Sequence, residues 1–319
     1  MHYRTLGRTG LEVSELGFGA WGIGADAWVG ADDDESLRAL RVAIEHGVNF
    51  LDTAHAYGDG HSEELVGAAV RESSETVYVA SKVSPKNWEW PARPGVHPEE
   101  VFPADWIVAC TERSLEKLGL ETIDVHQLHV WSDDWIGQGD WLDAIDRLKR
   151  DGKIRFFGVS INDHQPENAI RLVESGIVDT VQVIYNVFDQ SPEDALFPAV
   201  EAAHVGVIVR VPFDEGALTG SVRPETTFPD GDFRNVYFAG DRKREVWERV
   251  QAIAEDLDVE VDDLAEVALR FCLGHPATSV VIPGMRSTRN VERNARAASA
   301  GPLDESRLSK LRRHRWTAS

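Results

Sequence analysis

Cysteine is scarce in this chain, with two among 319 residues. Cys110 and Cys272 both stand inside apolar, helix-like patterns and lack the spacing of a metal or redox motif, so we expect buried free thiols. Such usage is typical of a reducing compartment. Apolar runs of about 18 residues, the length of a membrane-spanning helix, are also missing, and the opening MHYRTLGRTG contains no signal-peptide core. We therefore expect a cytoplasmic protein.

Lysine is rare as well, since 7 of the 33 basic residues are lysine and 26 are arginine. Acidic residues number 54, which gives a formal net charge of −21. A surface this acidic disfavours nucleic acid and anionic membranes unless a local basic patch exists, and the sequence shows no strong one. A small molecule is therefore the expected partner, and the sequence leaves the oligomeric state open.

Several catalytic signatures are missing. The near match to a dinucleotide-binding GxGxxG, GFGAWGIG at residues 17–24, runs into GADAWVG instead of a helix, so a Rossmann fold is not expected. There is no phosphate-binding Walker loop and no GxSxG nucleophile elbow. His55, His61, His126 and His129 lack a matching carboxylate cluster, so no metal site is expected.

Short apolar runs recur along the chain, and amphipathic stretches lie between them. The runs have the continuous apolar character of buried parallel strands; they are Ser14–Phe18, Val48–Leu51, Thr76–Ala80, Ile123–Leu128, Ile154–Val159, Thr180–Ile184, Val205–Val211 and Ser279–Ile282. The amphipathic stretches have the apolar period of surface helices; they are Ser36–Glu45, Ser62–Arg71, Asp105–Leu118, Trp141–Arg150, Glu167–Ser175, Pro192–Ala203 and Val261–Leu273.

Eight strand–helix units in about 300 residues predict a (β/α)8 TIM barrel. We expect residues 1–319 to form one α/β domain, preceded by an N-terminal β-hairpin around GRTG. Two long connections, Ser84–Phe102 and Glu215–Gly240, each follow a strand. They should therefore lie over the C-terminal mouth, where barrel active sites form.

Four groups with acid–base chemistry fall at the ends of consecutive strands. Asp52 ends the second run, Tyr57 follows in its loop, Lys82 ends the third run, and His129 ends the fourth. A charged lysine near a phenol lowers the phenol pKa, and a buried carboxylate can keep that lysine charged. The set therefore predicts a tyrosine that acts as a general acid. His126 competes with His129 for the histidine position.

The motifs GFGAWGIG, FLDTAHAYGDGHSEELVG, VYVASK, LGLETIDVHQLHVW, GKIRFFGVS, VQVIYN and VIPGMRSTRNVERN occur in this order along nearly the whole chain. In this set and order the sequence resembles the aldo-keto reductase superfamily. The resemblance implies a barrel that binds NADPH without a Rossmann domain. It also implies a catalytic tetrad of Asp52, Tyr57, Lys82 and His129, in which Tyr57 protonates a carbonyl oxygen.

The resemblance further implies which residues hold the cofactor and the substrate. The expected cofactor-binding positions are Gly19, Trp21, Asp52, Ser160, Asn162, Gln182, Arg210, Pro212, Leu218, Gly284, Arg286, Asn290, Arg293 and Asn294. The expected substrate-binding positions are Trp21, Trp88, Trp90 and His129. An aromatic wall of this kind suits apolar aldehydes and the flat faces of sugars alike.

Three departures from the family pattern bear on cofactor binding. Many relatives have Ser-Asn after the fifth strand, whereas Ile161 separates Ser160 from Asn162 here. Arg210 stands where many relatives stack an aromatic ring on the nicotinamide. Arg286 and Arg293 flank the expected adenosine side, and because arginine forms charge-assisted bonds to phosphate, we expect NADP(H) in preference to NAD(H).

The resemblance favours an NADPH-dependent reductase of an aldehyde, a ketone or a sugar. It leaves open an NAD(P)-dependent aldose or alcohol dehydrogenase that works in the oxidative direction. It also leaves open a nucleotide-binding regulatory subunit of the same fold. The physiological substrate is not encoded in any motif.

Overall fold

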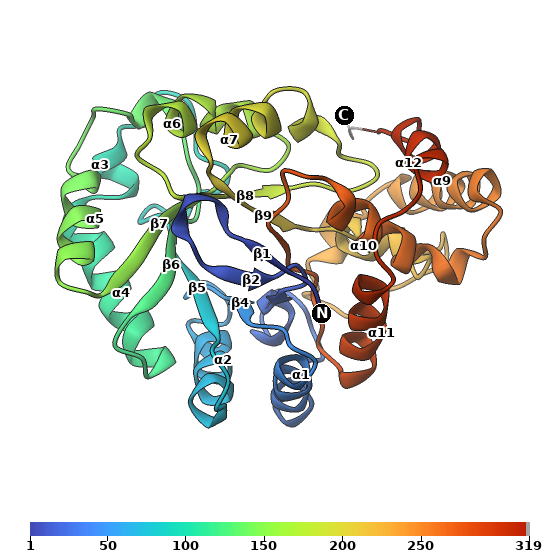
Figure 1. The fold of residues 1–319 in the computed structure, drawn as a ribbon, viewed down its shortest axis with the longest axis horizontal. Coiled ribbons are helices and arrows are strands. Elements are labelled where there is room, and N and C mark those ends of the chain that lie inside the picture. Colours follow the sequence, from blue (N-terminus) through green and yellow to red (C-terminus); the bar gives the residue numbers. More distant parts are fainter. Residues whose placement is uncertain (317–319) are drawn as a thin grey trace.

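The computed structural model describes residues 1–316 of the chain. Eight parallel strands form one sheet in the order β10-β9-β8-β7-β6-β5-β4-β3. Parallel bridges between Leu16 and Val281 and between Gly19 and Gly284 join the two ends of this sheet. Helices surround the barrel that results (Figure 1). The predicted (β/α)8 barrel is confirmed.

The strands are β1 (Tyr3–Thr5), β2 (Glu12–Ser14), β3 (Phe18–Gly19), β4 (Phe50–Asp52), β5 (Tyr78–Val83), β6 (Ile123–Leu128), β7 (Ile154–Ser160), β8 (Thr180–Ile184), β9 (Gly206–Arg210) and β10 (Val280–Val281). The α-helices are α1 (Asp33–Glu45), α2 (His61–Glu72), α3 (Pro98–Val101), α4 (Ala104–Leu118), α5 (Trp141–Arg150), α6 (Ile170–Ser175), α7 (Leu196–Ala203), α8 (Arg234–Tyr237), α9 (Arg242–Leu257), α10 (Leu264–Gly274), α11 (Thr288–Ser299) and α12 (Glu305–Arg312).

The sequence prediction has a run at each of the eight barrel strands, although the first run, Ser14–Phe18, shares only Phe18 with β3, and it omits five helices. Two of these, α3 and α8, are four-residue turns of helix inside the long connections. The long helix α9 carries buried Val246, Val250, Ile253 and Leu257 on one face. This spacing is a clear helical signal. The prediction missed it because α9 is an addition to the simple alternation of one helix after each strand.

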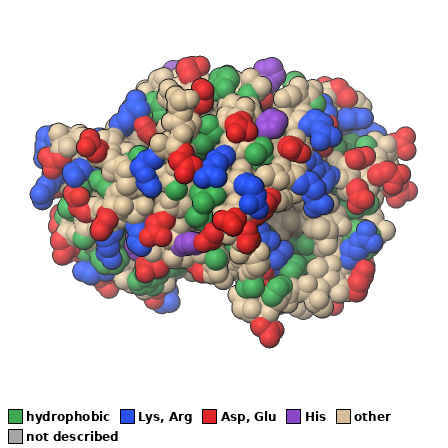
Figure 2. All heavy atoms as spheres, turned by 90° about the horizontal axis from the view of Figure 1, so that it is seen from below, with side chains coloured by type: hydrophobic (Ala, Val, Ile, Leu, Met, Phe, Trp, Pro, Cys, Tyr) green, Lys and Arg blue, Asp and Glu red, His purple; other side chains and the backbone are tan. Residues whose placement is uncertain are grey.

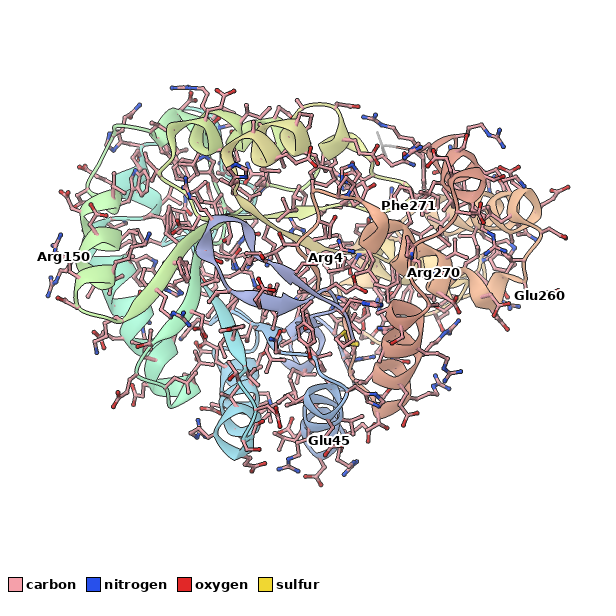
Figure 3. All side chains as sticks on the ribbon, in the orientation of Figure 1. Arg4, Glu45, Arg150, Glu260, Arg270 and Phe271 are labelled. Atoms are coloured by element: carbon pink, nitrogen blue, oxygen red, sulfur yellow. The ribbon has the colours of Figure 1, made fainter. Side chains whose placement is uncertain are left out.

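The predicted N-terminal hairpin closes the end of the barrel at which the parallel strands begin. Strand β1 pairs antiparallel with β2, in a register that joins Tyr3 to Ser14. Leu6, Leu11 and Val13 pack under the ends of the barrel strands. Arg4 donates to the carbonyl oxygens of Leu273 at 2.6 Å and Thr278 at 2.8 Å, which fastens the hairpin near the end of α10 (Figure 3).

Residues inside the barrel change from apolar to polar along the strands. Phe50, Val125 and Ile208 face the barrel interior on the side of the hairpin and pack against it. Because successive strand residues alternate in direction, the inward residues two positions further along are Asp52, Gln127 and Arg210. The barrel interior is therefore apolar where the strands begin and polar where they end. We call the polar residues at the C-terminal mouth the upper layer.

Other sequence expectations concern thiols and the surface. Cys110 and Cys272 are buried free thiols, as predicted. On the face drawn in Figure 2, acidic and basic side chains are interspersed. None of the helices within residues 1–316 has the length and apolar character needed to cross a membrane.

Candidate active site

A buried ion pair lies at the centre of the upper layer. Lys82 Nζ donates to Asp52 Oδ1 at 2.5 Å and to the Thr53 carbonyl oxygen at 2.8 Å. The Lys82 side chain is 0% exposed and that of Asp52 is 3% exposed. The two strands that carry them are neighbours in the sheet. The lysine charge is therefore compensated almost entirely by one carboxylate.

Two amides hold the second oxygen of Asp52. Gln182 Nε2 donates to Asp52 Oδ2 at 2.7 Å, and Gln127 Nε2 donates to the same atom at 3.3 Å. Gln182 was expected to contact the cofactor, and here its amide nitrogen binds the carboxylate. Gln127 was missed, although it stands two residues before His129 and therefore shares its side of the strand. Both amides fix the carboxylate that faces Lys82.

Tyr57 reaches the ion pair from the loop after β4. Its hydroxyl lies 3.2 Å from Lys82 Nζ, and the ring centroid lies 4.9 Å from the same nitrogen. Gly58 and Gly60 take the left-handed region with φ of +68° and +86°, and Gly60 is the residue before α2 begins. Glycine tolerates this region without a steric penalty, so the loop turns sharply enough to bring the phenol back to the lysine.

Burial controls the protonation of this pair. Burial raises the pKa of the Tyr57 phenol, and the nearby Lys82 charge opposes this rise without cancelling it. Lys82 thus lowers the phenol pKa as expected, but burial, which the sequence did not reveal, raises it by more. Burial also opposes the charged form of Lys82, but the Asp52 carboxylate and Tyr57 outweigh it and raise the pKa of Lys82. At neutral pH the pair is a protonated phenol beside an ammonium ion.

The two candidate histidines, His126 in β6 and His129 directly after it, face different sides of the strand. His126 points outward to α4, where its Nε2 lies 3.1 Å from Thr111 Oγ1. His129 lies at the mouth, with its ring centroid 5.7 Å from that of Tyr57. Burial, followed by the charges of Lys82 and Arg210, lowers the pKa of His129 well below 6.5, so its ring is neutral. Its Nδ1 has no hydrogen-bond partner within residues 1–316.

Aromatic side chains line two sides of the mouth. The Trp21 ring lies 6.3 Å from that of Tyr57, 6.0 Å from Trp28 and 5.2 Å from Phe233. On the other side Trp90 packs edge-on against His129, at 5.8 Å between ring centroids. The structure therefore brings the three predicted tryptophans, Trp21, Trp88 and Trp90, to the rim around Tyr57. Trp28 and Phe233 are additions that come from different loops.

Ser160, Ile161 and Asn162, at the end of β7 and directly after it, each contact different residues. Ser160 is buried and pairs in register with Gln182. Asn162 donates to Gln165 Oε1 at 3.1 Å and accepts from the Ala92 backbone at 3.3 Å, so its amide is engaged on both sides. Ile161 is buried and offers its carbonyl oxygen to Arg210 at 2.9 Å. Which of these residues meets a carboxamide stays a prediction.

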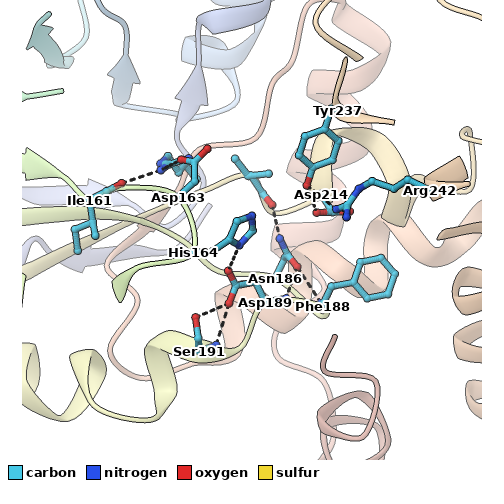
Figure 4. A network of polar contacts seen from close by, with 12 residues as sticks. Ile161, Asp163, His164, Asn186, Phe188, Asp189, Ser191, Asp214, Tyr237 and Arg242 are labelled. Atoms are coloured by element: carbon cyan, nitrogen blue, oxygen red, sulfur yellow. Dashed lines mark hydrogen bonds and ion pairs between the residues drawn. The ribbon is translucent and has the colours of Figure 1, made fainter. Parts of the chain in front are cut away.

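Arg210 belongs to a charged network after β7, β8 and β9, of which Figure 4 labels Asp163, His164 and Asp189. It donates to Asp163 Oδ1 at 2.6 Å, while its buried Nε has no partner within residues 1–316. Next to this pair His164 Nδ1 lies 2.6 Å from Asp189 Oδ2, and this hydrogen bond raises the pKa of His164. The Arg210 guanidinium is therefore largely neutralised by the Asp163 carboxylate. The position of Arg210 in the sequence did not reveal this pairing.

The loop after β9 has an unusual backbone. Val211, Asp214 and Glu215 have φ of +55°, +47° and +55°. Such angles are strained for residues other than glycine and are often found at functional sites. Pro212 and Leu218, both expected near the cofactor, are buried in this loop. Burial, with the charges of Asp214 and Asp163, raises the pKa of Glu215 from 4.5 to about 8.

Glu215→Gln is expected to change how stability depends on pH. The folded protein retains a proton on Glu215 that the unfolded chain releases. The contribution of this carboxyl to stability is therefore fully present below pH 4.5 and is lost as pH rises to about 8. Between pH 5 and pH 9 the free energy of unfolding of the variant should rise by roughly 2 kcal/mol relative to that of the wild type. This is less than the full effect of the pKa shift, because partial exposure screens the charge. Urea unfolding at both pH values measures this. Glu225→Gln, in an exposed position of the same connection, is the matched control; an equal effect of both variants would contradict the assignment.

The expected adenosine-side residues gather before and along α11. Arg286 is half-buried, makes no ion pair within residues 1–316, and donates to the Val29 carbonyl oxygen at 3.3 Å. Gly284 borders open space. Asn290 and Asn294 lie on α11, whereas Arg293 turns to the carbonyl oxygen of Asp262. Among the described residues Arg286 therefore has no carboxylate partner, whereas Arg293 is engaged by the backbone of Asp262.

Glu35 of α1 was not singled out from the sequence. Its Oε1 accepts from the backbone nitrogen of Thr288 at 2.9 Å and from the Thr288 hydroxyl at 3.2 Å. These bonds, the backbone one first, and the bond from Arg38 lower the pKa of Glu35. A carboxylate therefore already occupies the amino terminus of α11. No local signal joins residues 35 and 288, which are 253 positions apart.

Within the described residues no group of three or more His, Cys, Asp or Glu side chains is arranged to hold a metal ion.

Comparisons with known proteins agree with this arrangement. A sequence model of the aldo/keto reductase family matches residues 15–315. The chain is similar to aldo-keto reductase YhdN of Bacillus subtilis, at 29% identity over 92% of this chain and 87% of that protein. It is also similar to a probable voltage-gated potassium channel subunit beta of Arabidopsis thaliana, at 26% identity over 95% of this chain and 93% of that protein.

A solved structure covers the whole length. The holo form of aldo-keto reductase AKR11C1 from Bacillus halodurans superposes with a TM-score of 0.78 at 27% identity, over 100% of this chain and 97% of that one. The family match, the barrel and the geometry at its mouth thus lead to one conclusion: the chain belongs to the aldo/keto reductase family of oxidoreductases.

Proposed function

We propose that this protein reduces an aldehyde, a ketone or a sugar carbonyl to the alcohol with NADP(H), and that Tyr57 is the general acid. The observation that carries the proposal is the Tyr57 hydroxyl, 3.2 Å from a fully buried Lys82 that is itself bound to Asp52 at 2.5 Å. A protonated phenol with a fixed positive charge behind it can donate a proton and then be stabilised as the phenolate.

Each of the four residues has a separate task. Tyr57 holds the proton that the carbonyl oxygen receives, and Lys82 stabilises the phenolate that remains. Asp52 keeps Lys82 charged and directed toward the phenol. His129 is neutral, and the contact of its ring with that of Tyr57, at 5.7 Å between centroids, supports a hydrogen-bonding role toward the substrate oxygen. A nicotinamide cofactor, when bound, supplies the hydride for the carbonyl carbon.

The residues around the mouth fit such a cofactor. Arg286 is half-buried and makes no ion pair within residues 1–316, which supports binding of an anion, and the open space at Gly284 supports access to it. On the nicotinamide side we propose Gly19, Trp21, Ser160, Asn162, Gln182, Arg210, Pro212 and Leu218 as contacts. NADP differs from NAD by one phosphate, for which arginine is the preferred partner. Arg286 therefore favours NADP(H).

Glu35→Gln is expected to strengthen NADPH binding about two- to fivefold and to change NADH binding less, because a negative charge at the amino terminus of a helix competes with a phosphate for that terminus. The reason is that a phosphate near α11 would meet the Glu35 carboxylate. Quenching of tryptophan fluorescence measures both dissociation constants. Arg286→Met is the opposite control and should weaken NADPH more than NADH. Equal changes for the two cofactors in both variants would contradict the placement of the phosphate.

The direct test of function is the consumption of NADPH with 4-nitrobenzaldehyde, followed by NADH and by the reverse reaction with alcohols and aldoses. Turnover only in the reverse reaction would indicate an aldose or alcohol dehydrogenase. Tight binding of NADPH without turnover of any substrate would favour a regulatory subunit. We further propose that the chain acts as one barrel domain, residues 1–319, in the cytoplasm, with a small-molecule partner.

A further inference from the structure

A continuous series of ring contacts leads from Tyr57 to the outer surface. The centroid distances are 5.7 Å from Tyr57 to His129, 5.8 Å from His129 to Trp90, and 5.7 Å from Trp90 to Trp88. Distances of this size are those of aromatic rings in contact. The proposed proton donor and the outermost indole are therefore joined by an aromatic surface, which we call the aromatic track.

The outer end of the track is left open to solvent. Trp88 is 56% exposed and Trp90 is 43% exposed. Within residues 1–316 the other large apolar side chains with comparable exposure are Tyr3 and Val236, which are single residues elsewhere on the surface. Two exposed indoles in contact form an apolar patch at the mouth, and patches of this kind commonly mark binding sites.

The backbone supports the exposed position of these indoles. Trp88 has φ of +55°, a region that is costly for a bulky residue. The connection is anchored near both sides of the pair, by Lys86 N to the Val101 carbonyl oxygen at 2.8 Å and by Ala92 N to Asn162 Oδ1 at 3.3 Å. The connection is thus fixed on both sides of Trp88, whose indole remains exposed.

The polar groups beside the indoles bind one another. Glu89 binds Arg93 at 3.0 Å and accepts from Asn87 Nδ2 at 3.5 Å. Sugar hydroxyls need free donors and acceptors, whereas a flat apolar group needs only ring faces. The faces of Trp88 and Trp90 are what this loop offers to a ligand, so an aryl group is the better fit.

We propose that the aromatic track is a subsite for a second planar, apolar group of an elongated carbonyl substrate whose carbonyl lies at Tyr57. The inference rests on the proposed function, because it names the substrate class of that same site. It assigns Trp88 and Trp90 to specificity and leaves the proton transfer to Tyr57.

The test compares two substrates in wild type and in Trp88→Ala. One is 4-nitrobenzaldehyde, with a single ring, and the other is 4-benzyloxybenzaldehyde, with two rings. The variant should raise KM for the two-ring substrate about tenfold more than for the one-ring substrate, the size expected for one lost aromatic contact. The ratio of kcat between the substrates should stay the same. Tyr3→Ala, which removes an exposed ring at the closed end of the barrel, is the matched control and should change neither value.

Equal changes of KM for both substrates, or none, would overturn the inference. A Trp88-dependent KM for an aldose, but not for the two-ring aldehyde, would assign the indoles to a sugar ring and overturn the aryl class. Binding of 4-benzyloxybenzyl alcohol by titration calorimetry separates this inference from the proposed function. If wild type turns over neither aldehyde, weaker binding of this alcohol in Trp88→Ala still supports the subsite, and unchanged binding refutes it.

Discussion

Tyr57→Phe is expected to lower kcat by about 100- to 10,000-fold, the range over which a positioned general acid contributes. The change removes one oxygen atom, which now lies 3.2 Å from Lys82 Nζ, and leaves the aromatic ring in contact with His129. Binding of NADPH should persist, because the ring still fills its space. Initial rates and fluorescence titration on the same preparation measure both quantities.

The control for this change is Tyr3→Phe. Its hydroxyl donates to the Gly47 carbonyl oxygen at the surface, and Tyr3 lies in the hairpin strand β1 at the closed end of the barrel. Its removal should leave kcat and stability nearly unchanged. A Tyr57→Phe enzyme with wild-type kcat would refute the assignment of the proton donor. Loss of cofactor binding together with turnover would instead show that the phenol has a structural role.

Lys82→Met is expected to destabilise the fold by about 3–5 kcal/mol, because the change leaves a buried carboxylate without its partner. The side chains of Lys82 and Asp52 are 0% and 3% exposed, so water cannot replace the lost charge. Unfolding in urea, followed by circular dichroism, measures the free energy of unfolding. Turnover should fall as well, since the phenolate loses its stabilising cation.

A matched surface pair gives the control. Lys117 binds Glu64 at 2.6 Å, but the two side chains are 39% and 50% exposed. Lys117→Met should therefore cost less than about 1 kcal/mol. The double variant Asp52→Asn, Lys82→Met should recover much of the lost stability and none of the turnover. If Lys82→Met were as mild as Lys117→Met, the ion pair would not be the buried element that the structure shows.

Most of the barrel was predictable because its signals are local. Short apolar runs alternate with amphipathic stretches, and each run predicted a strand at nearly its observed place, such as Ile123–Leu128 for β6. The prediction failed for α9, α11 and α12. These helices lie in the last quarter of the chain, where the alternation of one strand with one helix no longer holds.

The choice between His126 and His129 shows what the alternation of side chains along a strand can predict. The resemblance selected His129, and the structure has an independent reason for this choice. Val125, Gln127 and His129 share the inner side of β6, while His126 points to Thr111 on α4. The same parity would have predicted Gln127 as a partner of Asp52, because residues two apart on a strand face the same way.

The sequence by itself determined the barrel, the placement of Asp52, Lys82 and His129 at strand ends, and the glycines that return Tyr57 to the mouth. These depend on residues close together in the chain. The tertiary structure decided which distant groups meet: Glu35 with Thr288, Arg210 with Asp163, and Gln182 with Asp52. It also decided the pKa of Tyr57, because burial depends on what surrounds a side chain and not on its neighbours in sequence.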